Sequence, residues 1–504
     1  MALTGFTFMT LMALTTLVHF VVPKRCQWMV LLAASVVFYL SFGVAQAGYV
    51  LITTALSYAG ALALRRLGDN AKLEGADKAG IKRRRRLMVV VLASAQLALL
   101  LALKYAGMIF PSAGGWIVPL GVSYFTLAAI GYVIDVYRVK YPPEKNPLRL
   151  LLFEICFLHI VQGPFGRYDQ LGAQLRAQHS LSYDAVKRGA LRMLWGYMKK
   201  TVAADWFGVY VNAAFGNPEQ YGGPTMVIAV VFFSLQMFMD FSGYMDIVCG
   251  AGMAMGITVP ENFDRPLGAH STAEFWRRWH ITLGAWFRDY VFFPVTVSRP
   301  AAKLAKALRG KGWTRLAKLS PALLAMCAVW PLTGLWHGAT WNFVLWGCLN
   351  GAAIAISMLA EPRFTAWRDK LRIKPQSLWW RALSVTRTFA LLSLIRVLIT
   401  TQDLPQAMGV YRALGRWSGI AWGSITSYGP GMRKLHLGFC AIACVITAIV
   451  LFVESRGSRE DVFNGFDRWP LLIKYAAAIV MIYLVVLFGA SGQSVRETFL
   501  YANF

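Results

Sequence analysis

The stretch KRRRRLMVVVLASAQLALLLAL, residues 82–103, indicates the structural class of this chain. Five consecutive cations precede a run of uncharged residues that is almost entirely apolar. A helix needs about 20 apolar residues to cross the hydrocarbon core of a bilayer, and clustered Lys and Arg stay on the cytoplasmic side. The stretch therefore predicts a transmembrane helix whose basic end lies in the cytoplasm.

The rest of the chain repeats this pattern. Of its 504 residues, 57% are hydrophobic and 15% are charged, with a mean hydropathy of +0.50, whereas soluble domains carry roughly 25% charged residues. The alternating polarity of a barrel is missing, so the spans are predicted to be helices. We expect an all-α, polytopic membrane protein with about 11 transmembrane helices. The apolar runs include Ala2–Val22, Met29–Phe42, Leu87–Leu103, Met226–Met239, Leu435–Val453 and Tyr475–Leu487.

The net charge of +27, from 51 basic and 24 acidic residues, would suggest a nucleic-acid partner in a soluble protein. Here the cations gather in short segments between spans, at residues 65–86 and 299–319, which we expect to be cytoplasmic loops facing anionic lipid. The first apolar run has no cation before it, and Lys24 and Arg25 follow it. This asymmetry predicts an external N-terminus and no cleavable signal peptide. The side of the C-terminus stays open, and no nucleic-acid partner is expected.

No soluble domain can be separated, so residues 1–504 are expected to form one membrane domain. Between about residues 120 and 350 the apolar windows are interrupted by Gly, Pro, Trp, His and charged residues. Polar groups at membrane depth are tolerated where they line a cavity or pack inside the protein, so the functional site is expected there. No metal site is predicted, because Cys440 and Cys444 share a helical face without histidine or carboxylate neighbours.

Two histidines are the leading candidates for chemistry. His337 lies in TGLWHGATWNF, residues 333–343, where Trp336 and Asn342 are its notable neighbours. His280 lies in FWRRWHITLGAWFRDY, residues 275–290, whose aromatic residues recur at helical spacing and predict one amphipathic helix. Composition alone favours an interfacial anchor for that helix and divides evenly between a structural and a functional His337.

A second group of polar residues lies on the segment around residue 240. Gln236, Asp240 and Tyr244 follow one another at intervals of four residues and therefore share a helical face. Buried carboxylates paired with cations are the favoured structural explanation for each residue individually. The functional alternative is that this face lines a substrate path.

Three strings resemble the core of the membrane-bound O-acyltransferase family. They are DFSGYMDIVCGAGMAMGITVPENFDRPL (residues 240–267), EFWRRWHITLGAWFRDYVFFP (residues 274–294) and LTGLWHGATWNFVLWGCLNG (residues 332–351). Within the family the chain is similar to the bacterial branch of alginate O-acetyltransferases and D-alanyl transfer proteins. The longer basic segment after the second string resembles the D-alanyl transfer proteins more, which leaves donor and acceptor open.

The resemblance implies a multi-pass protein of the bacterial inner membrane with a central tunnel and flanking interfacial or re-entrant helices. It implies that an acyl group, acetyl or D-alanyl, moves from a cytoplasmic acyl-CoA or acyl-carrier protein to a hydroxyl of an envelope polymer or a relay partner. His337 matches the family's invariant histidine and is expected to be the general base, with His280 assisting. Residues of the tunnel are then expected to be Trp276, Arg277, Trp279, Trp336, Asn342, Gln236, Asp240 and Tyr244.

The resemblance further implies no bound cofactor beyond the thioester co-substrate, contact with membrane lipid, and a separate extracytoplasmic acyltransferase as partner. The alternative class is an exporter of polysaccharide or lipid-linked sugar, in which the polar residues line a transport path without covalent chemistry. An exporter would more naturally show pseudo-repeated halves, which this sequence lacks. The acceptor polymer and the oligomeric state stay open.

Overall fold

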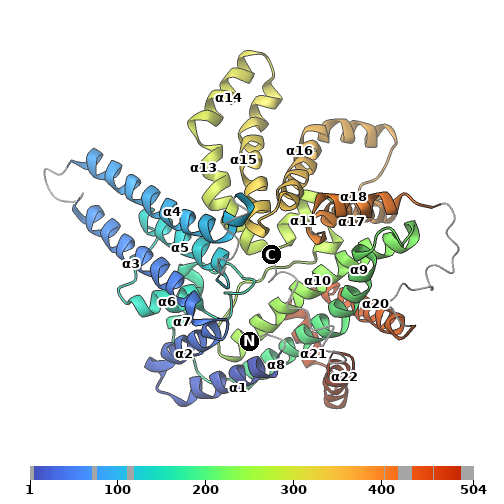
Figure 1. The fold of residues 1–504 in the computed structure, drawn as a ribbon, viewed down its shortest axis with the longest axis horizontal. Helices are drawn as coiled ribbons and strands as arrows, with labels where there is room; N and C mark the ends of the chain where they lie inside the picture. Colours follow the sequence, from blue (N-terminus) through green and yellow to red (C-terminus); the bar gives the residue numbers. More distant parts are fainter. Residues whose placement is uncertain are drawn as a thin grey trace. The chain divides into compact units, whose positions relative to one another are not determined.

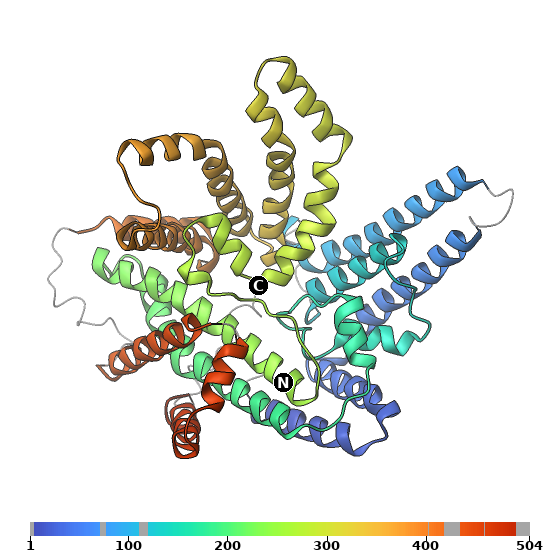
Figure 2. The ribbon, with the colours of Figure 1, turned by 180° about the vertical axis from the view of Figure 1, so that it is seen from behind.

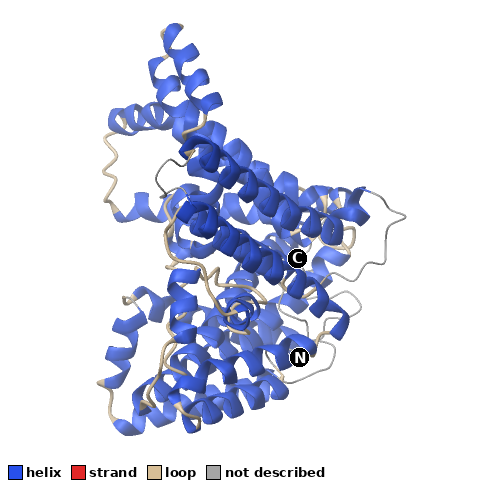
Figure 3. Cartoon of the chain, turned by 90° about the vertical axis from the view of Figure 1, so that its left-hand side faces the viewer, coloured by secondary structure: helices blue, strands red, loops and turns tan. Residues whose placement is uncertain are grey.

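A computed structural model describes residues 5–70, 77–109, 119–401, 403–417, 434–457 and 459–489. These residues form helices joined by loops, and the only β-type pairing among them is an isolated antiparallel bridge between Phe263 and Trp279 (Figures 1 and 3). The all-α prediction is therefore confirmed for the described residues.

Within the described residues, seven helices are long and apolar enough to cross a membrane, and three shorter helices are also apolar. The chain is thus a multi-pass membrane protein, while the expected total of about eleven spans stays a prediction. The long helices include α10 (Gly223–Ala254), α15 (Thr314–His337) and α16 (Trp341–Lys370).

The chain divides into two compact units. The first consists of Met1–Met193 and Met245–Glu261, and the second of Leu194–Tyr244 and Asn262–Phe504. The single membrane domain expected from the sequence stays a prediction. The first unit contains α1 (Phe6–Val21), η1 (Lys24–Cys26), α2 (Gln27–Leu40), η2 (Val44–Gln46), α3 (Ala47–Asn70), α4 (Lys78–Ile109), α5 (Val122–Tyr137), α6 (Pro147–Ile155), η4 (Tyr168–Gly172), α7 (Ala173–Arg176) and most of α8 (Tyr183–Tyr197).

The second unit holds most of α10 and the remaining described helices. They are η5 (Met198–Ala204), α9 (Asp205–Gly216), η6 (Pro266–Gly268), α11 (Thr272–Arg278), α12 (Ile281–Phe287), η7 (Arg288–Phe292), α13 (Phe293–Thr296), α14 (Arg299–Gly310), α15, α16, α17 (Leu378–Thr400), α18 (Leu404–Leu414), α20 (Lys434–Ser455), α21 (Arg459–Asp467) and α22 (Leu471–Gly489).

The basic segments expected to be loops are largely helical. The cations of residues 82–86 lie on α4, which packs beside α3 in the first unit (Figures 1 and 2). Residues 299–310 form α14, because Ser298 caps the helix by accepting from the Ala301 N–H at 3.4 Å and Pro300 suits its first turn. The prediction of loops was therefore wrong in local structure, while the cytoplasmic placement of these segments stays a prediction.

The amphipathic helix expected over residues 275–290 is also not continuous. Helix α11 ends at Arg278 and α12 begins at Ile281, with His280 between them in the left-handed region at φ 48° and ψ 50°. The Ile281 N–H donates to the Asn262 carbonyl at 3.1 Å, and the Asp264 N–H donates to the Arg278 carbonyl at 3.0 Å. These bonds to the preceding loop replace the helical ones, a long-range pairing that helical periodicity does not reveal.

Helices α15 and α16 approach closely at three glycines. A Cβ atom at Gly347 would lie 2.2 Å from the Trp330 carbonyl oxygen, and one at Gly334 would lie 2.2 Å from that of Phe343. Gly351 similarly faces the Trp330 side chain. Small residues at such crossings let two membrane helices pack with their backbones near each other. Because His337 ends α15, this crossing sets the position of that residue against α16.

A Gly347→Ala substitution should separate the two helices, because backbone cannot move aside as a flexible side chain can. We expect a loss of about 1–3 kcal/mol of stability, as for other overpacked sites. Thermal unfolding of the purified protein in detergent measures it. Gly438→Ala is the matched control, since a Cβ atom there meets nothing within 4 Å. Equal melting temperatures for the two variants would contradict the close crossing.

Candidate active site

His280 is held by the break between α11 and α12. The Asn262 side chain, fully buried, fixes the start of α12: its Oδ1 accepts from the Thr282 N–H at 3.0 Å and from the Thr282 hydroxyl at 2.6 Å. The same oxygen lies 3.5 Å from Nδ1 of His280. A non-glycine residue in the left-handed region costs free energy and persists where the surroundings enforce it, often at functional sites. Asn262 therefore positions the imidazole.

The His280 ring lies in an apolar environment. It is 2% exposed, with its ring centroid 4.9 Å from that of Phe241 and 5.8 Å from that of Trp336. Burial lowers the pKa of His280 to about 3, because desolvation disfavours the charged form. The imidazole is therefore neutral at physiological pH and can act as a hydrogen-bond partner without carrying charge.

His337 lies close to the His280 ring but belongs to another helix, α15. It is the last residue of α15, is 4% exposed, and its ring centroid lies 6.4 Å from that of His280. The Trp336 ring lies 4.7 Å away and the Trp346 ring, on α16, 5.1 Å away at 87°. The structure thus brings together two histidines that are 57 positions apart in sequence (337 minus 280).

A cavity of about 370 Å³ has both histidines in its wall. Its volume is within the range of small-molecule sites. Buried imidazoles, an aromatic and aliphatic lining, and two exposed arginines distinguish it from ordinary core packing. The lining residues are Ala273, Trp276, Arg277, Trp279, His280, Leu283, Gly284, Phe287, Arg288, Phe292, Met326, Val329, Trp330, Thr333, His337 and Ile354.

The tryptophan side of the cavity is anchored to α16 by Asn350. Trp276 Nε1 donates to Asn350 Oδ1 at 3.2 Å, and Asn350 Nδ2 donates to the Trp346 carbonyl at 2.8 Å. The Trp276 ring also makes edge contacts with Trp330 at 5.1 Å and Trp346 at 5.5 Å. Asn350 is fully buried. This network fixes the orientation of a ring that lines the cavity.

Asn262 and Asn350 were not among the residues predicted from the sequence to support the site. Only their presence inside the family-like strings could have singled them out. Their roles depend on contacts with residues 18 and 74 positions away.

The expected tunnel residues fall into two groups. Trp276, Arg277 and Trp279 line the cavity, and Trp336 contacts both histidine rings without lining it. The others lie outside its lining. Asn342 donates to the Thr401 carbonyl at 3.3 Å and so links α16 to the end of α17.

The polar face of α10 is buried in packing within the second unit. The Lys200 ammonium forms ion pairs with Asp240 at 2.6 Å and with Asp205 at 2.7 Å. Gln236 is 4% exposed and Tyr244 fully buried. These contacts match the structural explanation, in which buried carboxylates pair with cations. That this face also lines a substrate path stays a prediction.

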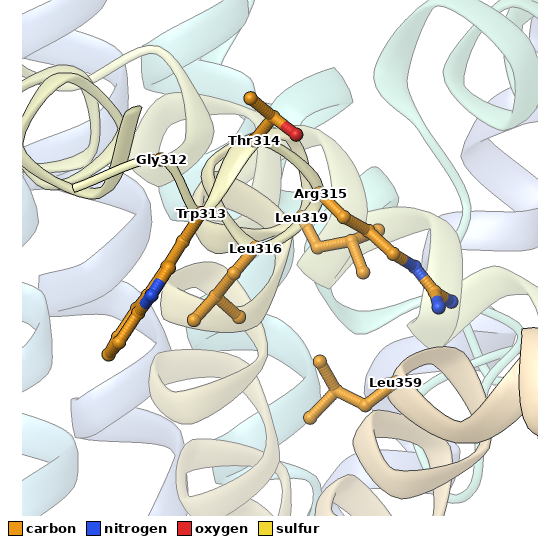
Figure 4. Close-up of a pocket in the computed structure, with 7 residues that line it drawn as sticks. All are labelled: Gly312, Trp313, Thr314, Arg315, Leu316, Leu319 and Leu359. Atoms are coloured by element: carbon orange, nitrogen blue, oxygen red, sulfur yellow. The ribbon is translucent and has the colours of Figure 1, made fainter. Parts of the chain in front are cut away.

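A second cavity, of about 330 Å³, lies at the turn between α14 and α15. Figure 4 shows Trp313, Arg315 and leucines of α15, with Leu359 of α16 facing them. Arg315 forms an ion pair with Glu361 at 3.6 Å. Because this lining contains no His, Asp, Glu, Lys or Cys that could act as a base in acyl transfer, the histidine cavity is the candidate site. The described residues also hold no group of three or more metal ligands.

Comparisons with known proteins agree with the earlier resemblance. The model of the membrane-bound O-acyltransferase family matches residues 145–308, a range that includes His280 and ends before His337. A probable alginate O-acetylase of Azotobacter vinelandii is 31% identical over 60% of this chain and 55% of its own length. The chain thus spans about half the length of that relative.

Two further relatives carry different names. A peptidoglycan O-acetyltransferase of Helicobacter pylori is 26% identical over 77% of this chain and 75% of its own length. A teichoic acid D-alanyltransferase of Bacillus subtilis is 26% identical over 54% of this chain and 65% of its own length. The resemblance to the family and to its bacterial envelope branch is therefore confirmed.

Proposed function

We propose that this chain, a relative of the membrane-bound O-acyltransferases, moves an acyl group from a thioester to a hydroxyl in the cavity that holds His280 and His337. The observation that carries the proposal is the convergence of two buried imidazoles, 6.4 Å apart, on one cavity inside a membrane protein. Ionisable side chains at such positions are costly and mark functional sites. The names of the relatives support the class of reaction.

In the proposed reaction His337 is the general base. It takes the proton of the acceptor hydroxyl as the oxygen attacks the thioester carbonyl carbon. The carbon–sulfur bond then breaks, and the proton passes to the leaving thiolate, so that an ester and a thiol are formed. Positioned acid–base catalysis of this kind contributes about 10²–10⁴ in rate.

His280 has the complementary part in this scheme. A neutral imidazole can donate a hydrogen bond to the carbonyl oxygen as negative charge develops there. Trp276, Trp279 and Trp330 line the same space with apolar rings, and an apolar surrounding strengthens such electrostatic contacts. The reaction needs no metal.

The donor is proposed to be an acyl-CoA or an acyl-carrier protein that approaches from the cytoplasm, beside the basic segments around residues 82–86 and 299–318. The acceptor is proposed to be an envelope polymer or an extracytoplasmic acyltransferase that completes the transfer. An inner-membrane location with the N-terminus outside fits this arrangement. The transferred acyl group is proposed to be acetyl or D-alanyl.

The proposed function is tested with purified protein in lipid vesicles. Labelled acetyl-CoA and, separately, a D-alanyl carrier protein are added on one side, and release of the donor thiol and transfer of label are followed. Acyl transfer predicts consumption of one of these thioesters. Transport of a glycan with neither thioester consumed would instead identify an exporter.

A His280→Ala variant is expected to retain folding but to lose most, though not all, of its activity, because the base at position 337 remains. Removing one hydrogen-bond donor to a developing oxyanion lowers rates by about 10²–10³. The measurement is the initial rate of thiol release at saturating donor. A wild-type rate in this variant would mean that His280 contributes to packing only and not to the reaction.

A further inference from the structure

The cavity that contains the histidines also contains an arginine with no ion-pair or hydrogen-bond partner in the described part of the chain. Arg277 lines the cavity at the end of α11, and its side chain is exposed, whereas His280 and His337 are buried. The lining therefore runs from an exposed part that carries a cation to a buried, apolar part that holds the imidazoles. This polarity suits a ligand with an anion at one end and a reactive group at the other.

The neighbouring arginines form ion pairs with carboxylates of the chain. Arg278 pairs with Glu274 at 2.7 Å, and Arg288, which also lines the cavity, pairs with Asp289 at 2.8 Å. No Asp or Glu lines this cavity. Arg277 is consequently the lining cation whose charge is left for a ligand. A guanidinium presents a planar set of donors that matches phosphate oxygens in two-point contacts.

The middle of the cavity fits an uncharged arm. Leu283, Phe287, Met326 and Val329 lie in its wall together with the tryptophans. A pantetheine arm combines alkyl segments with amides, ends in a thioester, and carries a phosphate at its other end. This is the chemistry that the lining would recognise.

We propose that Arg277 binds the phosphate at the end of the donor's pantetheine arm and so holds the thioester toward His280 and His337. This inference rests on the proposed function. The phosphate belongs to the diphosphate of CoA or to the phosphodiester that joins pantetheine to a carrier protein. Both sources present the same phosphate ester to the guanidinium, so the assignment concerns that group.

The test is a titration that needs no turnover. Wild-type protein and Arg277→Gln are titrated with CoA, with a holo carrier protein, and with pantetheine, which lacks the phosphate. Hydrogen bonds to charged groups contribute enough that we expect Kd to rise by about tenfold or more for CoA or for the carrier protein. The Kd for pantetheine should not change. Whichever phosphate ligand responds identifies the source.

Two further variants sharpen the result. Arg412→Gln on α18 removes one exposed cation that does not line the cavity and should leave every Kd at the wild-type value. Arg277→Lys keeps the charge but loses the two-point geometry, so it should recover part of the affinity.

The inference is overturned if Arg277→Gln leaves the Kd for both phosphate ligands unchanged. It is also overturned if the Kd for pantetheine rises by the same factor, because the substitution would then have damaged the cavity wall. Binding that depends on Arg277, without any thioester consumption by the wild-type protein, would leave this inference standing and reject the proposed function. The two proposals therefore fail by different results.

Discussion

A His337→Ala variant is expected to insert into the membrane at the wild-type level and to transfer no measurable acyl groups. The imidazole is the proposed base, and no Asp, Glu, Lys, Tyr or Cys lines the cavity to replace it. Loss of positioned base catalysis costs about 10²–10⁴ in rate. The measurement is acyl transfer to envelope acceptor in cells that carry the variant as their only copy, normalised to the protein in the membrane.

Two companion variants separate chemistry from packing. His337→Gln keeps a side chain of similar size that cannot accept the proton, so it should be as inactive as alanine. His270→Ala removes a partly buried histidine that does not line the cavity and should retain wild-type activity. Full acylation in the glutamine variant would mean that His337 only fills space.

A Lys200→Met variant is expected to lower the stability of the protein strongly. Lys200 is 3% exposed and pairs with Asp240 and Asp205, whose side chains are 2% and 12% exposed. Removing the cation leaves two buried carboxylates without it. Breaking a buried charge network in this way costs about 3–5 kcal/mol. Thermal unfolding of the protein in detergent should show a large fall in melting temperature.

The cause can be isolated by a second substitution. Asp240→Asn in the Lys200→Met background removes one of the stranded negative charges, so part of the lost stability should return. Arg412→Gln is again a suitable control, because it changes the net charge by the same amount at an exposed position. An unchanged melting temperature in Lys200→Met would show that the pair contributes no net stability. In that case, paired charge would not explain the polar face of α10.

Sequence patterns predicted the features that depend on local composition. The apolar run after Arg86 predicts a spanning helix because hydrophobic length is a local property, and the structure has α4 there. The segment around His280 shows the limit of this reasoning. Its aromatic periodicity predicts one helix, but hydrogen bonds from residues near Asn262 interrupt it. Periodicity cannot show pairing with a distant loop.

The candidate site was likewise predictable only in part. The two histidines were singled out by their apolar surroundings and by the family-like strings, and the structure places them at one cavity. The polar face with Gln236 and Asp240 lies outside that cavity's lining, because a buried lysine on η5 provides the partner for the carboxylate. Sequence alone does not tell a carboxylate that faces substrate from one that faces a cation on another helix.

The central claim is that the thioester reacts between His280 and His337. The most direct measurement is an experimental structure with an uncleavable donor analogue, in which a methylene group replaces the thioester sulfur. We predict that its acyl carbonyl lies within hydrogen-bonding distance of a ring nitrogen of His280, and that the carbonyl carbon is open to a hydroxyl held by His337. An analogue bound elsewhere, with the two rings packed and inaccessible to it, would contradict the account.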